Sequence, residues 1–173
     1  MSIVADGRFL RGFQNQAGLL GAIPVASEKR SGEEPKLDAV AGGIPIVRSW
    51  LGKHNASILK RSIDQADLEY LTREANGGNA EAILACRDAA KILGGVLTNL
   101  ATALSSEAMI FFGPLFKINA YREYLETILH SAIGSNRPLD VIISAKRPVD
   151  AAYMLAISEL ANSGLHLESL TPR

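Results

Sequence analysis

Two short apolar runs, residues 108–112 and 139–144, limit most strongly what this chain can fold into. Continuous apolar runs of this length are typical of strands buried on both faces of a sheet. Residues 118–133, between the runs, show helical periodicity, and so do residues 149–162 after the second run. Alternating strands and helices predict a layered α/β domain that contains at least one parallel pair of strands.

The remaining segments predict one hairpin and three helical regions. Asp6-Gly7, between two short β-prone runs, tolerates the positive φ angles of a tight turn and predicts a hairpin. Helices are expected from near Leu37, with an interruption at Gly42-Gly43 and Pro45, then over 64–75 and 80–104. Within the longest helix, Gly94-Gly95 favours close packing of that helix against a sheet.

Composition excludes several function classes. The 173 residues carry 18 basic and 18 acidic side chains, so no charge surplus attracts nucleic acid or an anionic membrane surface. No apolar run approaches the ~20 residues that span a bilayer, and residues 1–10 lack the pattern of a secretory signal. The single cysteine, Cys86, excludes an internal disulfide and fits the reducing cytoplasm. We therefore expect one cytoplasmic domain over residues 1–173.

No individual residue strongly indicates a metal, catalytic or ligand-binding site. His54, His130 and His166 lie far apart without the spacing of zinc ligands, and Cys86 is best explained as a small core residue. Gly113-Pro114 ends a predicted strand, where α/β folds bind ligands, although its position alone favours a plain strand-to-helix turn. Asp38 begins a helix, where the helix dipole favours an acid.

Two charged segments have similarly plain explanations. Residues 27–36, which read SEKRSGEEPK, are typical of a solvated loop. Lys146 and Arg147 follow the second predicted strand, and Asp150 lies in the first turn of the helix after it. These residues can contact a phosphate or carboxylate, but helix capping is a sufficient explanation.

Four blocks of sequence, in their order and spacing, give the chain a family resemblance. The blocks read IVADGRFLRGFQNQAGLLG, KLDAVAGGIPIV, ILGGVLTNLATALSSEAMIFFGPL and SAKRPVDAAYMLAI. Together they resemble the C-terminal lobe of the ROK family, which comprises bacterial sugar kinases and the sugar-responsive transcription repressors related to them. The resemblance covers nearly all the chain.

The resemblance implies the C-terminal lobe of an actin-like, ribonuclease H-like sugar-kinase fold, incomplete at its N-terminal edge. The Gly-Thr-Gly phosphate turn of the family, the strand before it and the N-terminal lobe would then be missing. In the kinases that lobe carries the catalytic base, an aspartate that deprotonates the sugar hydroxyl. Phosphoryl transfer depends on positioning and electrostatic stabilisation of both reactants. No catalytic residue is therefore expected here, and this chain should not transfer phosphate unaided.

The resemblance also implies that the sugar-and-zinc corner of the family has lost most of its chemistry. Leu19 and Ala22 stand where the family has a sugar-binding glutamate and a zinc-binding histidine. Lys29, Ser31 and Lys36 stand at cysteine positions, and ammonium or hydroxyl groups do not replace zinc-bound thiolates. No metal is expected. Asp38 falls on an acidic position of the zinc motif and can still accept a hydrogen bond from a sugar hydroxyl.

This sequence also departs from the family's pattern at the nucleotide site. Gly113, Pro114 and Leu115 occupy the place of a glycine run whose backbone approaches the adenosine of ATP. Proline removes an N–H donor there, and the Gly-Pro-Leu form resembles the repressor branch, which need not bind ATP. We expect neither ATP with magnesium nor zinc as a cofactor.

Two functions fit these residues. The first is a non-catalytic ROK-like module, the sugar-sensing or oligomerising half of a regulator or a relic of one. The second is a piece of an ATP-dependent sugar kinase that needs a missing N-terminal lobe. We expect a small-molecule sugar and a second copy of the chain as partners. Direct DNA binding is not expected, because no helix-turn-helix is visible.

Overall fold

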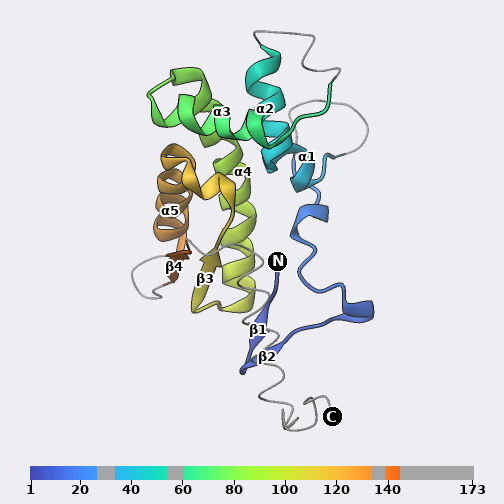
Figure 1. Ribbon diagram of the computed structural model, residues 1–173. Coiled ribbons are helices and arrows are strands. Elements are labelled where there is room, and N and C mark those ends of the chain that lie inside the picture. Colours follow the sequence, from blue (N-terminus) through green and yellow to red (C-terminus); the bar gives the residue numbers. More distant parts are fainter. Residues whose placement is uncertain (27–33, 54–60, 134–138, 145–173) are drawn as a thin grey trace, which may run out of the picture.

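The computed structural model describes residues 1–26, 34–53, 61–133 and 139–144 (Figure 1). Its elements, with η for a short 3₁₀ helix, are β1 (Val4–Ala5), β2 (Arg8–Phe9), η1 (Phe13–Asn15), η2 (Leu20–Ala22), α1 (Leu37–Ala41), α2 (Gly43–Gly52), α3 (Gln65–Asn76), α4 (Ala80–Leu104), β3 (Ala108–Phe111), η4 (Pro114–Lys117), α5 (Asn119–Ile133) and β4 (Asp140–Ile143). The predicted helix over 149–162, with Lys146, Arg147 and Asp150, lies outside the described residues, as do His54 and His166.

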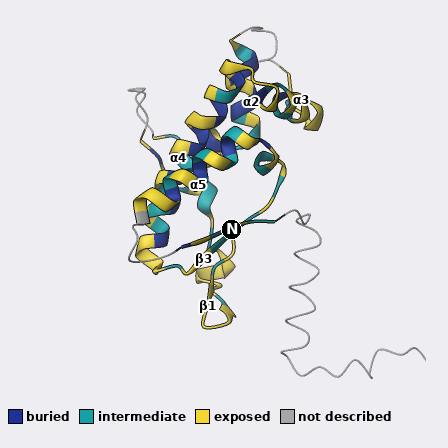
Figure 2. Cartoon of the chain, turned by 90° about the vertical axis from the view of Figure 1, so that its left-hand side faces the viewer, coloured by how far each residue is buried: buried dark blue, intermediate teal, exposed yellow. Residues whose placement is uncertain are grey.

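The core is built around the long helix α4, which packs along α5 and also contacts α1, α2 and α3. Figure 2 shows the buried residues concentrated where these helices face one another. Cys86, on α4, is fully buried, and burial raises the pKa of its thiol to about 12. The prediction that Cys86 is a core residue is confirmed.

A glycine lets α4 and α5 approach closely. A β-carbon at Gly94 would lie 2.8 Å from Cγ2 of Ile128 on α5, whereas one at Gly95 would meet open space. Close packing at this glycine pair was predicted correctly, but the element against which it packs was predicted wrongly. Gly94 faces a helix and not a sheet, because α5 lies directly along the small-residue face of α4.

Strands β3 and β4 form the predicted parallel pair, with Ile110 opposite Ile142. Met109, Phe111 and Val141 pack against the helical core from one face of this pair. The expectation that the strands are buried on both faces is wrong for the described residues. Ile110 is 63% exposed and Ile142 46% exposed, because no described element covers the opposite face.

Helices α2 and α3 pack beside α4 and form the upper part of Figure 1. Pro45 lies in the first turn of α2, where its missing N–H costs no hydrogen bond. Helix α3 begins with a capping box, in which Asp64 and Asp67 each accept a hydrogen bond from the backbone N–H of the other. Arg61 also forms an ion pair with Asp67.

The predicted hairpin is present as β1 and β2, which pair antiparallel around Asp6 and Gly7. Both turn residues have positive φ, 51° and 71°, as the Asp-Gly sequence indicated. The hairpin forms a separate two-stranded sheet that is not paired with β3 or β4.

Candidate ligand-binding sites

The first candidate site is the corner that joins η2 to the start of α1. Val25 donates its N–H to the Pro35 carbonyl at 2.9 Å, and Leu37 donates its N–H to the Ile23 carbonyl at 2.8 Å. Pro24 and Lys36 form an antiparallel bridge between the same segments. These backbone contacts hold η2 against the first turn of α1, the turn that carries Asp38.

Gly21 and Asp38 meet at this corner. A β-carbon at position 21 would overlap with the carboxylate of Asp38, so only glycine leaves room for that side chain in its present position. Asp38 is nevertheless exposed to solvent. Its oxygens can therefore accept hydrogen bonds from a ligand that carries hydroxyl groups.

The other corner positions carry no metal-binding chemistry. Leu19 is 60% exposed, Ala22 is exposed, and Lys36 is exposed at the bridge beside Asp38. Apolar side chains and an ammonium group do not bind zinc, so these described residues do not fit that ion. Within the described part of the chain, no three His, Cys, Asp or Glu side chains lie close enough to hold a metal ion. Lys29 and Ser31 lie outside it.

The second candidate site is the turn between β3 and η4. Gly113 has φ 124° and ψ 173°, a backbone conformation that residues other than glycine rarely adopt. Pro114 opens η4 at a position where its missing N–H is harmless, and Phe116 donates its N–H to the Gly113 carbonyl at 3.3 Å. A plain strand-to-helix turn therefore accounts for the local geometry.

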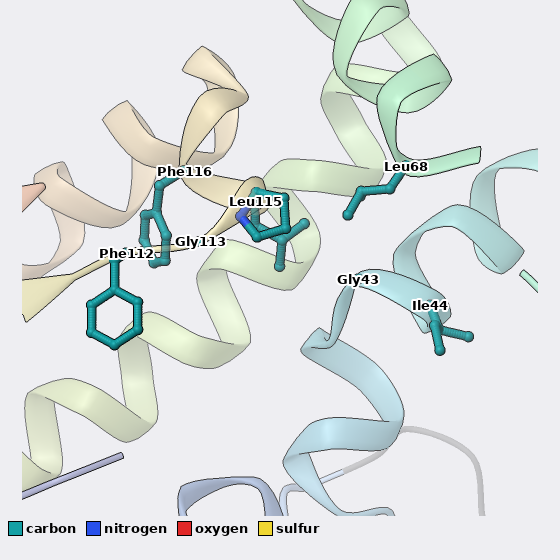
Figure 3. A pocket seen from close by; sticks show the side chains of 8 residues that line it. Gly43, Ile44, Leu68, Phe112, Gly113, Leu115 and Phe116 are labelled. Carbon is teal, nitrogen blue, oxygen red and sulfur yellow. The ribbon is translucent and has the colours of Figure 1, made fainter. Parts of the chain in front are cut away.

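A pocket of about 310 Å³ nevertheless opens at this turn (Figure 3). Residues 112–116 form one side, Gly43 and Ile44 at the start of α2 form another, and Leu68 reaches in from α3. The lining side chains are all apolar. None of them offers a cation or hydroxyl to a phosphate, so the walls fit an apolar or ring-shaped group better than a triphosphate.

The pocket contains only one of the two predicted sites. Gly113, Pro114 and Leu115 all line the pocket, whereas Asp38 does not. The contributions of Gly43 and Leu68 to the pocket were not predicted from the sequence. The glycine pair before Pro45 was a weak indication that the backbone at Gly43 could approach a ligand. A single leucine on α3, such as Leu68, does not indicate a pocket.

No model of a known protein family and no curated protein matches the sequence. Solved structures do match the fold. A ROK family transcriptional regulator, homologous to the E. coli MLC protein, matches with TM-score 0.67 and 20% identity over 82% of this chain and 38% of its own. The ROK hexokinase of Thermus thermophilus matches with TM-score 0.65 and 23% identity over 87% of this chain and 49% of its own.

A third match is the ROK family glucokinase of Streptomyces griseus, solved in complex with glucose and AMPPNP. It has TM-score 0.59 and 22% identity over 82% of this chain and 51% of its own. This chain thus spans about half the length of these structures or less. The predicted resemblance to ROK proteins is confirmed at the level of the fold, which is a partial actin-like fold shared by ROK kinases and a ROK regulator.

Proposed function

We propose that this chain is a non-catalytic sugar-binding module, equivalent to the C-terminal lobe of a ROK-type regulator over residues 1–173. The observation that carries the proposal is the contact between Gly21 and Asp38. It joins two segments that the resemblance assigns to the sugar corner, and it leaves one carboxylate exposed there.

The chemistry of the corner supports a sugar as the ligand. Asp38 accepts hydrogen bonds from hydroxyl groups, and the backbone bonds on either side of it hold its helix turn in place before a ligand arrives. Leu19, two residues before Gly21, adds exposed apolar surface of the kind that packs against the C–H face of a sugar ring.

The chemistry of the pocket supports the absence of catalysis. Phosphoryl transfer requires groups that neutralise phosphate charge, and the pocket lining supplies no charged side chain. Pro114 also removes one of the backbone N–H groups that a glycine run would offer to a nucleotide.

A kinase fragment is the second candidate, and two observations favour it. The matched structures include a hexokinase and a glucokinase bound to glucose and AMPPNP. A ligand-sized pocket also lies at the turn where the resemblance places adenosine. In that case the chain would phosphorylate a sugar only together with an N-terminal lobe.

We further propose that the chain acts in the cytoplasm, associates with itself and does not contact DNA directly. Exposed apolar side chains such as Phe13, at 83%, and Ile110 support self-association. Among the described helices, none is long and apolar enough to cross a membrane.

The proposal is tested by thermal unfolding of the chain across a panel of hexoses and amino sugars. We expect at least one sugar to raise the melting temperature of the wild type and of Asp88→Ala, a control at an exposed acid of α4, but not of Asp38→Ala. A coupled assay of ADP release with the same sugars should show no turnover. Robust turnover by this chain alone would overturn the proposal.

A further inference from the structure

The side chain of Asn76, the last residue of α3, links that helix to the start of α5. Its Nδ2 group donates a hydrogen bond to the Lys117 carbonyl at 3.0 Å, and its Oδ1 atom accepts one from the Asn119 N–H at 2.9 Å. Lys117 is the last residue of η4, and Asn119 is the first residue of α5. One amide group therefore serves as donor and acceptor to two backbone groups that are distant in the sequence.

The residue after Asn76 makes this side chain chemically labile. Asn76-Gly77 is the one Asn-Gly pair in the sequence. The backbone nitrogen that follows an asparagine can attack the side-chain amide, and glycine obstructs this attack least because it has no side chain. Both residues are exposed, so water and hydroxide can reach them.

The reaction needs no enzyme and no cofactor. The Gly77 nitrogen loses its proton to hydroxide and bonds to Cγ of Asn76. The bond from Cγ to Nδ2 then breaks, and ammonia leaves with a proton taken from water. Water opens the resulting cyclic imide and leaves aspartate or isoaspartate at position 76. Either product lacks the N–H donor of the original amide.

The folded chain holds both reacting groups away from this reaction. Gly77 donates its N–H to the Arg73 carbonyl at 2.8 Å, so the attacking nitrogen keeps its proton and is turned toward the helix. The Asn76 amide is held at two of its atoms by Lys117 and Asn119. The attack therefore requires the last turn of α3 to open and the amide to leave both partners.

We propose that Asn76 is a deamidation site that the start of α5 protects, so that the reaction proceeds only when the junction of α3 and α5 opens. After the reaction the Lys117 carbonyl has lost its donor and faces a carboxylate. Residues 114–116 of η4 line the apolar pocket, and Leu68 of α3 forms another part of its wall. A brief opening of the junction is thereby converted into a lasting covalent change beside the pocket.

The first test compares the folded and unfolded states of the full chain. Deamidation is followed in mildly alkaline buffer by mass spectrometry of the proteolytic peptide that contains Asn76. We expect the reaction to be severalfold slower in the folded chain than in the same chain unfolded in guanidinium chloride. Equal rates in the two states would overturn the proposal.

Position 119 offers a pair of variants that isolates the protecting contact. Asn119→Pro removes the N–H that donates to the Asn76 amide, at the first position of α5, where proline is tolerated. Ile118 has an extended backbone, with φ −88° and ψ 109°, which suits a residue before proline. Asn119→Ala loses the same side chain and keeps the N–H.

We expect deamidation at Asn76 to be severalfold faster in Asn119→Pro than in the wild type, and unchanged in Asn119→Ala. Circular dichroism shows whether both variants are folded under the conditions of the assay. Equal rates in the two folded variants would contradict protection by α5. If Asn119→Pro does not fold, the rates of the folded and unfolded wild type decide the question.

A second pair of variants tests the effect on η4. Asn76→Asp reproduces the loss of the donor, whereas Asn99→Asp adds the same charge at an exposed position of α4. Ile118 donates its N–H to the Leu115 carbonyl at 3.1 Å, at the end of η4. Amide hydrogen exchange measured by NMR at Ile118 should be severalfold faster in Asn76→Asp and unchanged in Asn99→Asp. Equal exchange in the two variants would contradict a release of η4 by deamidation.

Discussion

The carboxylate of Asp38 lies against Gly21, in the space that a β-carbon at position 21 would occupy. This contact joins two residues that are 17 positions apart in the sequence. It also explains why glycine is needed in a segment whose neighbouring positions carry no polar chemistry. The corner thus keeps its backbone path and one acidic side chain.

Gly21→Ala should displace the Asp38 carboxylate at a small cost in stability. Asp38 is exposed and its carboxylate can rotate away, so we expect a loss of about 1 kcal/mol in the free energy of unfolding, at the low end for overpacking. Asp38→Ala in the same chain should remove that loss, because the overlapping atoms are gone. Urea unfolding of both single variants and the double variant measures this coupling. Fully additive effects would show that the two residues do not touch.

The neighbouring glycines of α4 should respond in opposite directions to alanine. Gly95→Ala places its methyl group in open space and should stabilise the helix by up to about 1 kcal/mol. Gly94→Ala forces a methyl group against Ile128 and should destabilise the protein by about 1–3 kcal/mol. Because both changes add the same helix propensity, each is the control for the other. Equal unfolding midpoints would contradict the close packing of α4 on α5.

The start of α3 should lose stability in acid. Hydrogen bonds from the Arg61 guanidinium, and then from the Asp64 backbone N–H, lower the pKa of Asp67 from 3.8 to about 2. A lowered pKa in the folded state stabilises the protein above the unfolded value, and this stabilisation is lost as the pH falls from about 4 towards about 2.

A melting-temperature series across this pH range checks the contribution of Asp67. The wild type should lose more stability on acidification than Asp67→Asn, which has no carboxylate to protonate. Asp88→Asn, at an exposed acid of α4, should follow the wild type. Parallel curves for the wild type and Asp67→Asn would contradict the contribution of the ion pair.

Local sequence signals predicted most of the elements. Asp6-Gly7 indicated the hairpin through its tolerance of positive φ, and the three- and four-residue apolar spacing indicated α4 at residues 80–104. The alternation of strand, helix and strand indicated the parallel pair of β3 and β4. Each of these features is encoded within a few neighbouring residues.

Features that depend on distant residues were predicted less well. An apolar strand reads the same whether one face or both are covered, so the exposure of Ile110 was not foreseen. Gly43, Leu68 and Leu115 line the same pocket but lie on three separate elements, and their spacing in the sequence does not predict that they lie close together. The contact of Gly21 with Asp38 likewise depends on the backbone path between them.

The proposed function requires that Asp38 binds a sugar in a module that does not phosphorylate it. The most direct measurement is a sugar titration followed by the backbone amide NMR shifts of the wild type and Asp38→Ala, with and without ATP. We expect saturable shifts around Gly21 and Asp38 in the wild type, no saturation in Asp38→Ala, and no sugar phosphate when ATP is added. Saturation that survives in Asp38→Ala, or formation of a sugar phosphate, would contradict it.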